Sequence, residues 1–455
     1  MEKSDLLQGK KHLHFIGIGG SGMYPLVQIL AAQGYKITGS DVLEGDIINY
    51  ERAMGIDVHI GHAAQNVHGA DLVVYTAALL PGNPEKEEAQ RLGIPCVERS
   101  IMLGYVAGLY PQSICVSGTH GKTTTTSMVT QILVSAGKDP AAVIGGKLPL
   151  IGGYGRSGKG ENIVVEACEF SNTFLHLRPY VSIILNIDAD HLDFFGDMAG
   201  LKAAFKEFAA LTTGPIIANG EDENTMQVLA GMDAQLITYG IGKGFTYGAE
   251  NVHEARPSFY SFTATLDGVP IGDFTLSVPG LHNVSNALAA IAACHTTGCT
   301  AAEIAQGLAG FKGAGRRFEL MGEVNGITIV DDYAHHPAEL AATLKAAKNM
   351  GYKKVWAVHQ PFTYSRTKTL LKDFAEALRI ADEVVMTEIM GSRETNEKFN
   401  IYTKDLAALI PGSVWFNTFE EVVAYTMAHA SAGDLVITLG CGDIYKAAKM
   451  MVGEK

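Results

Sequence analysis

The chain has 455 residues, 47% of them hydrophobic and 18% charged, with a formal net charge of -13. This length exceeds one ordinary hydrophobic core and predicts two to four domains, while the negative charge disfavours general binding to nucleic acid. No apolar run reaches the ~18 residues that span a bilayer, and the opening MEKSDLLQGKKHLHF lacks the apolar core of a secretory signal.

The six cysteines are scattered along the chain and form no Cys-x-x-Cys pair. This pattern favours a reducing cytosol and argues against a disulfide scaffold or a zinc ribbon. We therefore expect a cytoplasmic globular protein with small-molecule partners and neither nucleic acid nor membrane among them. We expect it to be a monomer or a weak homodimer.

Residues 12–110 alternate short strands and helices. HLHFIGIGG is typical of a buried strand that ends in glycines, and MYPLVQILAAQG follows with the apolar spacing of a helix. YKITGSD and DLVVYTAAL repeat the strand-then-turn pattern. These repeated βαβ units predict a Rossmann-like parallel sheet with helices packed on it.

A second block begins at SICVSGTHGKTTTTSMVTQILVSAG, which predicts a strand, a glycine-rich loop and a long helix. Further strands are predicted at NIVVEACE, VSIILNID, PIIANG and QLITYG. YSFTATLDGVPIGDFTLSV predicts an antiparallel hairpin, and HNVSNALAAIAACHTTG predicts a closing helix. The order is typical of a P-loop ATPase-like domain with a mostly parallel sheet.

The glycine-rich stretch GFKGAGRRFE is interpreted as a linker to a third block. There, GITIVDDYA, KKVWAVH, ADEVVMTE, GSVWFNT and DLVITLG predict strands with helical segments between them, as in a C-terminal Rossmann-like domain. The predicted fold class is therefore α/β with three domains, over residues 1–110, 111–314 and 315–455.

The strongest local motif is the glycine-rich loop between a strand and a helix. It consists of Gly118, Thr119, His120, Gly121, Lys122, Thr123 and Thr124. Its glycines let successive backbone N–H groups face an anion, and the helix N-terminus adds its dipole. Lys122 can then reach the β- and γ-phosphates of a nucleotide, and the Thr123 hydroxyl can bind Mg²⁺. A polar turn is the alternative, because the glycines lie closer together than in the usual Walker loop, but the context favours a nucleoside triphosphate.

A second glycine pattern, G-x-G-x-x-G, occupies residues 17–22, where a strand gives way to a helix. Its usual interpretation is a dinucleotide site, with an acid ~20 residues further on that binds a ribose hydroxyl. Asp41, at the end of the next predicted strand, has that position. NAD and a UDP-sugar both remain possible here. Two phosphate-binding loops in one chain favour transfer between two phosphorylated ligands over hydride chemistry.

Acids and a histidine follow two predicted strands of the second block. They are Glu166 and Glu169 in VVEACEF, then Asp188, Asp190, His191 and Asp193 in NIDADHLD, of which Asp193 is expected to cap a helix. Ligands of open parallel sheets bind outside the carboxyl ends of the strands. Glu166 and His191 there predict a divalent metal between a triphosphate and an acceptor.

Polar residues also gather around the start of the third block: Arg316, Arg317, Glu319, Asp331, Asp332, Tyr333, His335 and His336. An arginine aimed at a γ-phosphate would stabilise the charge of phosphoryl transfer, although a surface ion pair is an equal alternative. Arg366, in HQPFTYSRT, could pair bidentately with a carboxylate.

These motifs, in this order, resemble the Mur ligase family over essentially the whole chain. The blocks that carry the resemblance are GTHGKTTT, EACEF, NIDADH, HNVSNALAA, GRRFE and DDYAHHP. Within the family, HFIGIGGSGM and DDYAHHP are most similar to the members that join L-alanine to UDP-N-acetylmuramate, and EACEF is similar to their Gram-positive form. The resemblance implies an ATP-dependent, amide-forming ligase of peptidoglycan precursor synthesis that works through an acyl phosphate with ATP and Mg²⁺.

The resemblance also implies a role for each matching position. The implied catalytic residues are Lys122, Glu166, His191, Arg317 and His335, and the implied metal ligands are Thr123, Glu166 and His191. The implied ATP contacts are the loop 118–124, His282, Asn283, Asn286, Arg317 and Asp332. The implied substrate contacts are Gly19, Ser21, Gly22, Asp41, His62, His335 and Arg366, which reassigns the first glycine-rich loop to a uridine diphosphate.

The sequence departs from the family pattern in two places. Phe362 stands where the family often has a histidine, although Arg366 is retained for a carboxylate. Several family branches carry a carbamylated lysine after the NIDADH block, and neither Lys202 nor Lys206 clearly aligns with it.

Three other functions remain as alternatives. The nearest is a ligase of the same family that adds a peptide to the same nucleotide sugar, but Tyr333 favours the single-amino-acid enzyme. An NAD-dependent oxidoreductase built on residues 12–110 would leave the second loop unexplained. A nucleotide-binding regulator would turn over ATP slowly and would not respond to amino acids.

Overall fold

The computed structural model describes residues 6–392 and 394–454, except for the side chain of residue 193. The chain divides into two compact units, which are described separately. Unit 1 comprises the described residues up to Glu250, Thr263–Phe274 and Ser285–Gly310. Unit 2 comprises Asn251–Phe262, Thr275–Val284 and the described residues from Phe311 onward.

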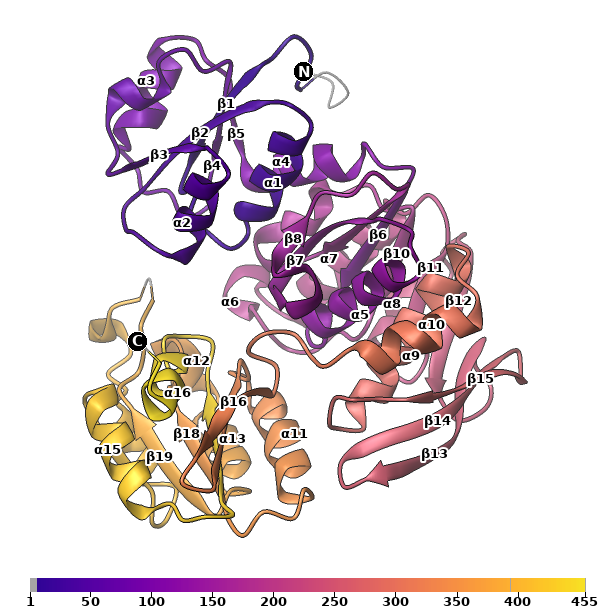
Figure 1. Ribbon diagram of the computed structural model, residues 1–455, viewed down its shortest axis with the longest axis vertical. Helices are drawn as coiled ribbons and strands as arrows, with labels where there is room; N and C mark the ends of the chain where they lie inside the picture. Colours follow the sequence, from indigo (N-terminus) through magenta and orange to yellow (C-terminus); the bar gives the residue numbers. More distant parts are fainter. Residues whose placement is uncertain (1–5, 393, 455) are drawn as a thin grey trace. The chain divides into compact units, whose positions relative to one another are not determined.

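The first sheet lies in unit 1 and confirms the predicted Rossmann-like order (Figure 1). Its strands are β1 (His12–Ile16), β2 (Lys36–Asp41), β3 (Asp57–Ile60), β4 (Leu72–Tyr75) and β5 (Cys96–Glu98). The helical elements of this part are α1 (Tyr24–Ala32), α2 (Asp46–Ala53), η2 (Ala64–Val67), α3 (Pro84–Arg91) and α4 (Arg99–Ala107). All pairs are parallel in the order β3-β2-β1-β4-β5, so the chain reverses direction across the sheet between β1 and β4. The carboxyl ends of strands at such a switch point bind ligands.

The second sheet carries the phosphate loop between β6 (Gln112–Ser117) and α5 (Lys122–Ser135), as predicted. Its other strands are β7 (Ala141–Leu148), β8 (Gly153–Arg156), β9 (Asn162–Glu166), β10 (Val181–Ile184), β11 (Ile216–Asn219), β12 (Leu236–Ile241), β13 (Tyr247–Arg256), β14 (Phe259–Leu266) and β15 (Val269–Thr275). The order is β15-β14-β13-β12-β11-β10-β6-β9-β7-β8. The pairs from β13 to β7 are parallel, and β8 is antiparallel to β7.

The remaining helical elements of this part are η3 (Pro149–Ile151), η4 (Phe170–His176), α6 (Leu192–Phe195), α7 (Met198–Ala210), α8 (Glu223–Leu229), α9 (His282–Thr296) and α10 (Ala301–Gly310). Strand β6 lies between β9 and β10, so the phosphate loop and the acid-bearing ends of both neighbouring strands share one edge. The sequence analysis expected the phosphate-binding and metal-binding residues at this edge.

The third sheet lies in unit 2. Its strands are β16 (Glu319–Val324), β17 (Ile327–Asp332), β18 (Val355–His359), β19 (Glu383–Thr387), β20 (Val414–Phe416) and β21 (Leu435–Leu439). The order is β16-β17-β21-β18-β19-β20, parallel except for β16 against β17. Its helical elements are α11 (Pro337–Lys348), α12 (Tyr364–Thr369), α13 (Leu371–Leu378), η5 (Asn396–Lys398), α14 (Thr403–Ala407), α15 (Phe419–His429) and α16 (Tyr445–Val452).

Strands β3, β5, β7, β8, β13 and β16 were not individually predicted from the sequence. Most of β13 is exposed or half-buried and polar. Strand β16 begins at Glu319, the last residue of the stretch interpreted as a linker, and contains a register shift between Leu320 and Gly322. Such strands lack a clear hydrophobic alternation, so pairing with a neighbouring strand decides their conformation. Within the two described ranges, no helix has the length and hydropathy needed to cross a bilayer.

One hydrophobic core joins the first two sheets of unit 1. It includes Met102 and Leu103 of α4 together with Phe174 and Leu177 from the second sheet's side. At Gly104 an added Cβ would lie 2.1 Å from the His176 carbonyl oxygen, so glycine permits α4 to pack directly on that backbone. This packing brings the first glycine-rich loop and the end of β9 to the walls of one pocket.

Candidate active site

The phosphate loop needs glycine at both of its motif positions. Gly118 has φ +136 and Gly121 has φ +85, a left-handed conformation that costs glycine little. A Cβ on Gly121 would also lie 2.6 Å from Asn286 Oδ1 of α9. The fold therefore brings Asn286, an expected ATP contact, against this loop within unit 1.

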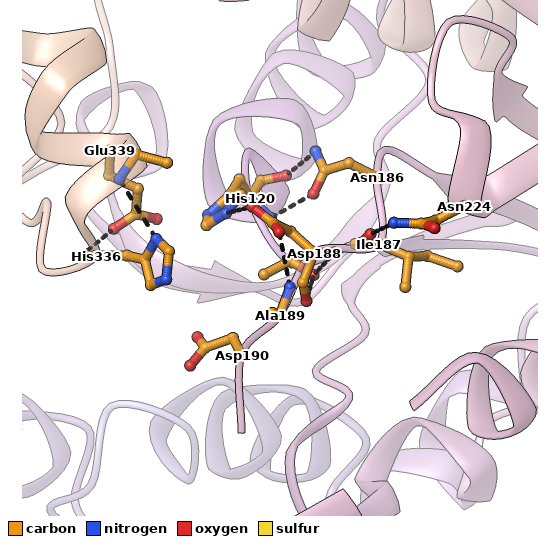
Figure 2. A network of polar contacts seen from close by, with 12 residues as sticks. His120, Asn186, Ile187, Asp188, Ala189, Asp190, Asn224, His336 and Glu339 are labelled. Carbon is orange, nitrogen blue, oxygen red and sulfur yellow. Dashed lines mark hydrogen bonds and ion pairs between the residues drawn. The ribbon is translucent and has the colours of Figure 1, made fainter. Parts of the chain in front are cut away.

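The end of β10 fixes the conformation of the loop (Figure 2). His120 N donates to Asn186 Oδ1 at 2.8 Å, and Asn186 Nδ2 donates back to the His120 carbonyl at 3.1 Å. Asp188 N donates to Thr119 Oγ1 at 2.9 Å, and the Asp188 carboxylate lies 3.4 Å from His120 Nε2. The side chains of Thr119 and His120 are thus engaged with the residues that follow β10.

Lys122 makes an ion pair that the sequence analysis did not identify. Its Nζ lies 2.9 Å from Glu169 Oε2 and donates to the carbonyls of Gly118 and Thr119, the second at 3.0 Å. Burial alone lowers the pKa of Lys122, but the Glu169 charge outweighs it and the pKa is raised. Lys122 is therefore charged and is held on its own loop.

Glu166, at the end of β9, contacts the loop through Thr123. The Thr123 hydroxyl donates to Glu166 Oε1 at 3.0 Å, and Gly145 N donates to Oε2 at 2.7 Å. A Cβ on Gly145 would lie 2.6 Å from either carboxylate oxygen, so only glycine admits this close approach. One hydroxyl and one carboxylate meet here, and hard oxygen ligands of this kind suit Mg²⁺.

His191 lies in a different environment. It adopts φ 54, its ring lies 4.7 Å from the ring of Phe170, and its Nε2 lies 3.6 Å from Asp190 Oδ2. Among the described residues, no group of three or more His, Cys, Asp or Glu side chains is arranged to hold a metal ion. Glu166 and His191 would therefore not complete a metal site by themselves, and further oxygen atoms from hydroxyls, water or bound phosphate would be needed. Lys202, on α7, donates to Gln227.

The first glycine-rich loop is joined to Asp41 by a backbone hydrogen bond, a contact that the motif did not predict. Gly19 N donates to Asp41 Oδ2 at 3.0 Å, and Gly17 and Ile18 donate their N–H groups to the Ser40 carbonyl. His62, from the loop after β3, lies 3.0 Å from Ser40 Oγ through its Nδ1. Three expected substrate contacts, Gly19, Asp41 and His62, thus lie at the same edge of the first sheet, at or after the ends of β1, β2 and β3.

A pocket of about 290 Å³ in unit 1 lies between the first glycine-rich loop and the end of β9, which contacts the phosphate loop. Ser21 and Gly22 line it together with Glu166, Cys168 and Arg99. Three atoms of the Arg99 guanidinium group lie 3.4 to 3.5 Å from where a Cβ on Gly22 would stand. Burial lowers the pKa of Arg99, and no carboxylate in the part of the chain that the structure describes pairs with it. The sequence analysis missed Arg99, because its context in CVERSIML has no motif.

In unit 2, the end of β17 holds two buried acids. Asp331 pairs with Arg316 at 2.9 Å, whereas Asp332 accepts from Phe318 N at 2.7 Å and Ala334 N at 2.8 Å. Burial raises the pKa of Asp332 to about 6, although the Arg317 charge opposes the shift. The two neighbouring arginines thus act on different acids: Arg316 forms an ion pair with Asp331, and the Arg317 charge acts on Asp332.

The other expected residues of unit 2 lie near helix starts. His335 Nδ1 lies 3.0 Å from the Tyr333 carbonyl oxygen and 3.4 Å from the carboxylate of Glu339. Glu339 Oε2 also accepts from His336 N (Figure 2). Arg366 is in α12, whose cap is Thr363. His282 and Asn283 open α9, where Asn283 Nδ2 donates to the Pro279 carbonyl at 2.7 Å. Burial lowers the pKa of His282.

Comparison with known proteins assigns three successive parts of the chain to one family. Residues 12–110 match the Mur ligase family, catalytic domain. Residues 116–294 match the Mur ligase middle domain, and residues 316–442 match the Mur ligase, glutamate ligase domain.

Relatives that match nearly the whole chain support the same family assignment. The UDP-N-acetylmuramate–L-alanine ligase of Alkaliphilus metalliredigens is 43% identical over 450 residues, which covers 98% of each chain. The enzyme of the same name from Agathobacter rectalis is 46% identical over 440 residues, 95% of this chain and 96% of that one. The chain therefore belongs to the Mur ligase family, as its motifs predicted.

The solved structure of the UDP-N-acetylmuramate–alanine ligase of Thermotoga maritima has a TM-score of 0.82 and 30% identity, covering 97% of this chain and 98% of that one. A murein peptide ligase from Psychrobacter arcticus has a TM-score of 0.75 and 26% identity. The predicted three-domain α/β fold class is confirmed.

Proposed function

We propose that the chain joins L-alanine to the carboxylate of UDP-N-acetylmuramate at the expense of ATP, in peptidoglycan precursor synthesis. One observation carries the proposal. A single pocket is lined by Ser21 and Gly22 of the first loop and by Glu166, which contacts Thr123 of the phosphate loop. A nucleotide sugar bound by its diphosphate at the first loop can present its acid beside ATP. The relatives named for this activity cover 95% or more of the chain.

The chemistry follows from the need to activate a carboxylate. Oxide is a poor leaving group, so the carboxylate oxygen first attacks the γ-phosphorus of ATP, which gives an acyl phosphate and ADP. The amine of L-alanine then attacks the acyl carbon and phosphate leaves. Lys122 would offset the charge on the transferred phosphoryl group, with Arg317 as a second cation. His191 and His335 are the candidates for the group that takes the amine proton.

Mg²⁺ fits the donors at the end of β9. Glu166 and the Thr123 hydroxyl offer hard oxygen atoms, and His191 is the proposed further ligand. When bound, the ion would screen the negative charge of the phosphates and the acceptor carboxylate. The hydrogen bond from Gly145 N orients the Glu166 carboxylate for this role.

The remaining assignments are part of the same proposal. The UDP-sugar would contact Gly19, Ser21, Gly22, Asp41 and His62. ATP would contact the loop 118–124, Asn286, His282, Asn283, Arg317 and Asp332. The amino acid would contact His335 and Arg366. We retain domain boundaries at 110 and 314, a cytoplasmic location, and a monomer or weak homodimer.

The test is ADP release with ATP, Mg²⁺, UDP-N-acetylmuramate and, in turn, L-alanine, glycine, L-serine and a tripeptide. We expect ADP only when the sugar nucleotide and L-alanine are both present, together with a product of the ligated mass. Lys122→Met should lower kcat by about 10²-fold or more, since it removes a charge that stabilises the transition state. Lys159→Met, at an exposed position, is the control.

Other outcomes of this experiment would favour one of the alternative functions. ADP release with the tripeptide alone would assign the chain to the peptide-adding branch of the family. Slow ATP turnover that ignores every acceptor would contradict ligation and favour a regulator.

A further inference from the structure

Glu85 is a fully buried carboxylate in the domain of the first glycine-rich loop, in the first turn of α3. Its side chain is 0% exposed. Ser40 Oγ and Asn66 Nδ2 both donate to it at 2.5 Å, and His62 Nδ1 lies 3.1 Å from its Oε2. Ala63 N completes the set at 3.4 Å. The Glu85 carboxylate therefore holds several segments of the chain together.

The carboxylate is ionised at neutral pH. Burial alone raises the pKa of Glu85, but contacts with His14, Ser40 and Asn66 outweigh burial and lower the pKa to about 2. The helix N-terminus also favours negative charge at this position. His14, on β1, has its Nε2 3.8 Å from Glu85 Oε2, while its Nδ1 is 2.9 Å from Thr38 Oγ1. The titratable groups that face Glu85 are thus His14 and His62.

These contacts determine which nitrogen of His62 carries hydrogen. Ser40 Oγ gives its hydrogen to Glu85, so toward His62 Nδ1 it is an acceptor, at 3.0 Å. The ionised Glu85 is an acceptor as well. Nδ1 is therefore an N–H donor, and in the neutral ring Nε2 carries the lone pair. Nε2 makes no hydrogen bond with any residue in the described part of the chain.

The residues that contact Glu85 are connected to the first glycine-rich loop. The Ser40 carbonyl accepts the N–H groups of Gly17 and Ile18, and the next residue, Asp41, accepts from Gly19 N. The His62 side chain is 19% exposed, so its ring borders the surface next to these strand ends. A change at Glu85 can therefore reach a ligand through His62.

We propose that Glu85 is the positioning residue of the UDP-sugar site: it holds His62 in the Nδ1–H tautomer, so that Nε2 accepts a hydrogen bond from an N–H or O–H group of the nucleotide. This inference rests on the proposed function only for the identity of the ligand. The geometry of Ser40, His62 and Glu85 is independent of it.

The first experiment measures kinetics of Glu85→Gln. A glutamine offers both a donor and an acceptor, so the tautomer of His62 is no longer fixed. We expect KM for UDP-N-acetylmuramate to rise about 10-fold or more, the effect of one lost hydrogen bond, with kcat and KM for ATP nearly unchanged. Glu87→Gln, an exposed position on the same helix, should leave all three constants unchanged.

A double-mutant cycle separates positioning from general damage. If Glu85 acts through His62, then Glu85→Gln adds no further rise in KM in the His62→Ala background. Additive effects of the two substitutions would overturn the proposal. Should Glu85→Gln fail to fold, Ser40→Ala replaces it in the same cycle, with a smaller expected rise.

The tautomer itself is measurable without turnover. In protein labelled with ¹⁵N-histidine, the His62 ring signal, assigned by its absence in His62→Ala, should show hydrogen on Nδ1. Binding of UDP alone should then shift the Nε2 signal. A ring with hydrogen on Nε2 in the wild type would refute the proposal even if ligation is confirmed. The expected tautomer together with no ligase activity would instead place the error in the proposed function.

Discussion

Lys122 Nζ lies 2.9 Å from Glu169 Oε2, and the two side chains are only 13% and 3% exposed. The lysine that is proposed to bind ATP phosphates is therefore paired with an internal anion when no nucleotide is present. A triphosphate that recruits Lys122 must compete with this carboxylate. We therefore expect Glu169 to stabilise the empty loop and to oppose nucleotide binding through the same contact.

Glu169→Gln should lower the stability of the nucleotide-free protein by about 3 kcal/mol, because one partner of a buried ion pair is lost. A non-hydrolysable ATP analogue should restore part of this loss, so its stabilising shift in Tm should exceed that of the wild type. Thermal unfolding with and without the analogue checks this, with the exposed Glu207→Gln as the control. An unchanged ligand-induced shift would mean that Glu169 stays on Lys122 when nucleotide binds.

Gly145→Ala should damage catalysis more than folding. The new Cβ would lie 2.6 Å from both oxygens of Glu166, so the carboxylate must move away from Thr123. We expect kcat to fall about 10-fold or more and the Mg²⁺ concentration for half-maximal rate to rise, since misplaced ligands weaken metal sites. Gly45→Ala, where no atom lies within 4 Å, is the matched substitution and should retain activity.

Arg99→Met should weaken binding of the anionic substrate. The guanidinium has no carboxylate partner among the described residues, and it lies against Gly22 in the pocket, so a phosphate or carboxylate of the substrate is its expected partner. KM for UDP-N-acetylmuramate should rise about 10–100-fold, with KM for ATP little changed. Arg91→Met, at an exposed site, is the control. A fall in Tm of the free protein with KM unchanged would instead assign Arg99 a structural role.

Glu51→Gln should stabilise the protein in a defined pH range. Glu51 is 0% exposed and neither carboxylate oxygen has a hydrogen-bond partner within the described residues. Burial, with a smaller effect of the Asp41 charge, raises its pKa from 4.5 to about 8. The folded state must therefore bind a proton that the unfolded state releases, so stability is lost as pH rises from 4.5 to about 8.

The substitution should remove that loss. Chemical denaturation at pH 4 should show little gain for Glu51→Gln, whereas at pH 8 the free energy of unfolding should increase by roughly 2–4 kcal/mol. Glu87→Gln should show no such dependence. An equal difference between Glu51→Gln and wild type at both pH values would mean that the buried carboxyl is not protonated in the folded protein.

The sequence predicted the βαβ order of the first sheet and the strand–loop–helix context of Lys122, because both depend on local patterns. Alternating apolar segments and glycine positions are visible within a short window of residues. The family resemblance extended this to most expected contacts. Strands such as β13 and β16 were missed, since their polar faces gain stability only from their neighbours in the sheet.

By itself, then, the sequence determined the class of fold, the family and the positions of both glycine-rich loops. Only the tertiary structure decided the partners of the charged groups. Glu169 meets Lys122 across 47 positions of sequence, and Ser40 meets Glu85 across 45. Arg99 reaches its pocket because α4 packs on the backbone beside His176. Ion pairs and buried hydrogen bonds depend on distances set by packing between elements, and the sequence between those elements does not specify such distances.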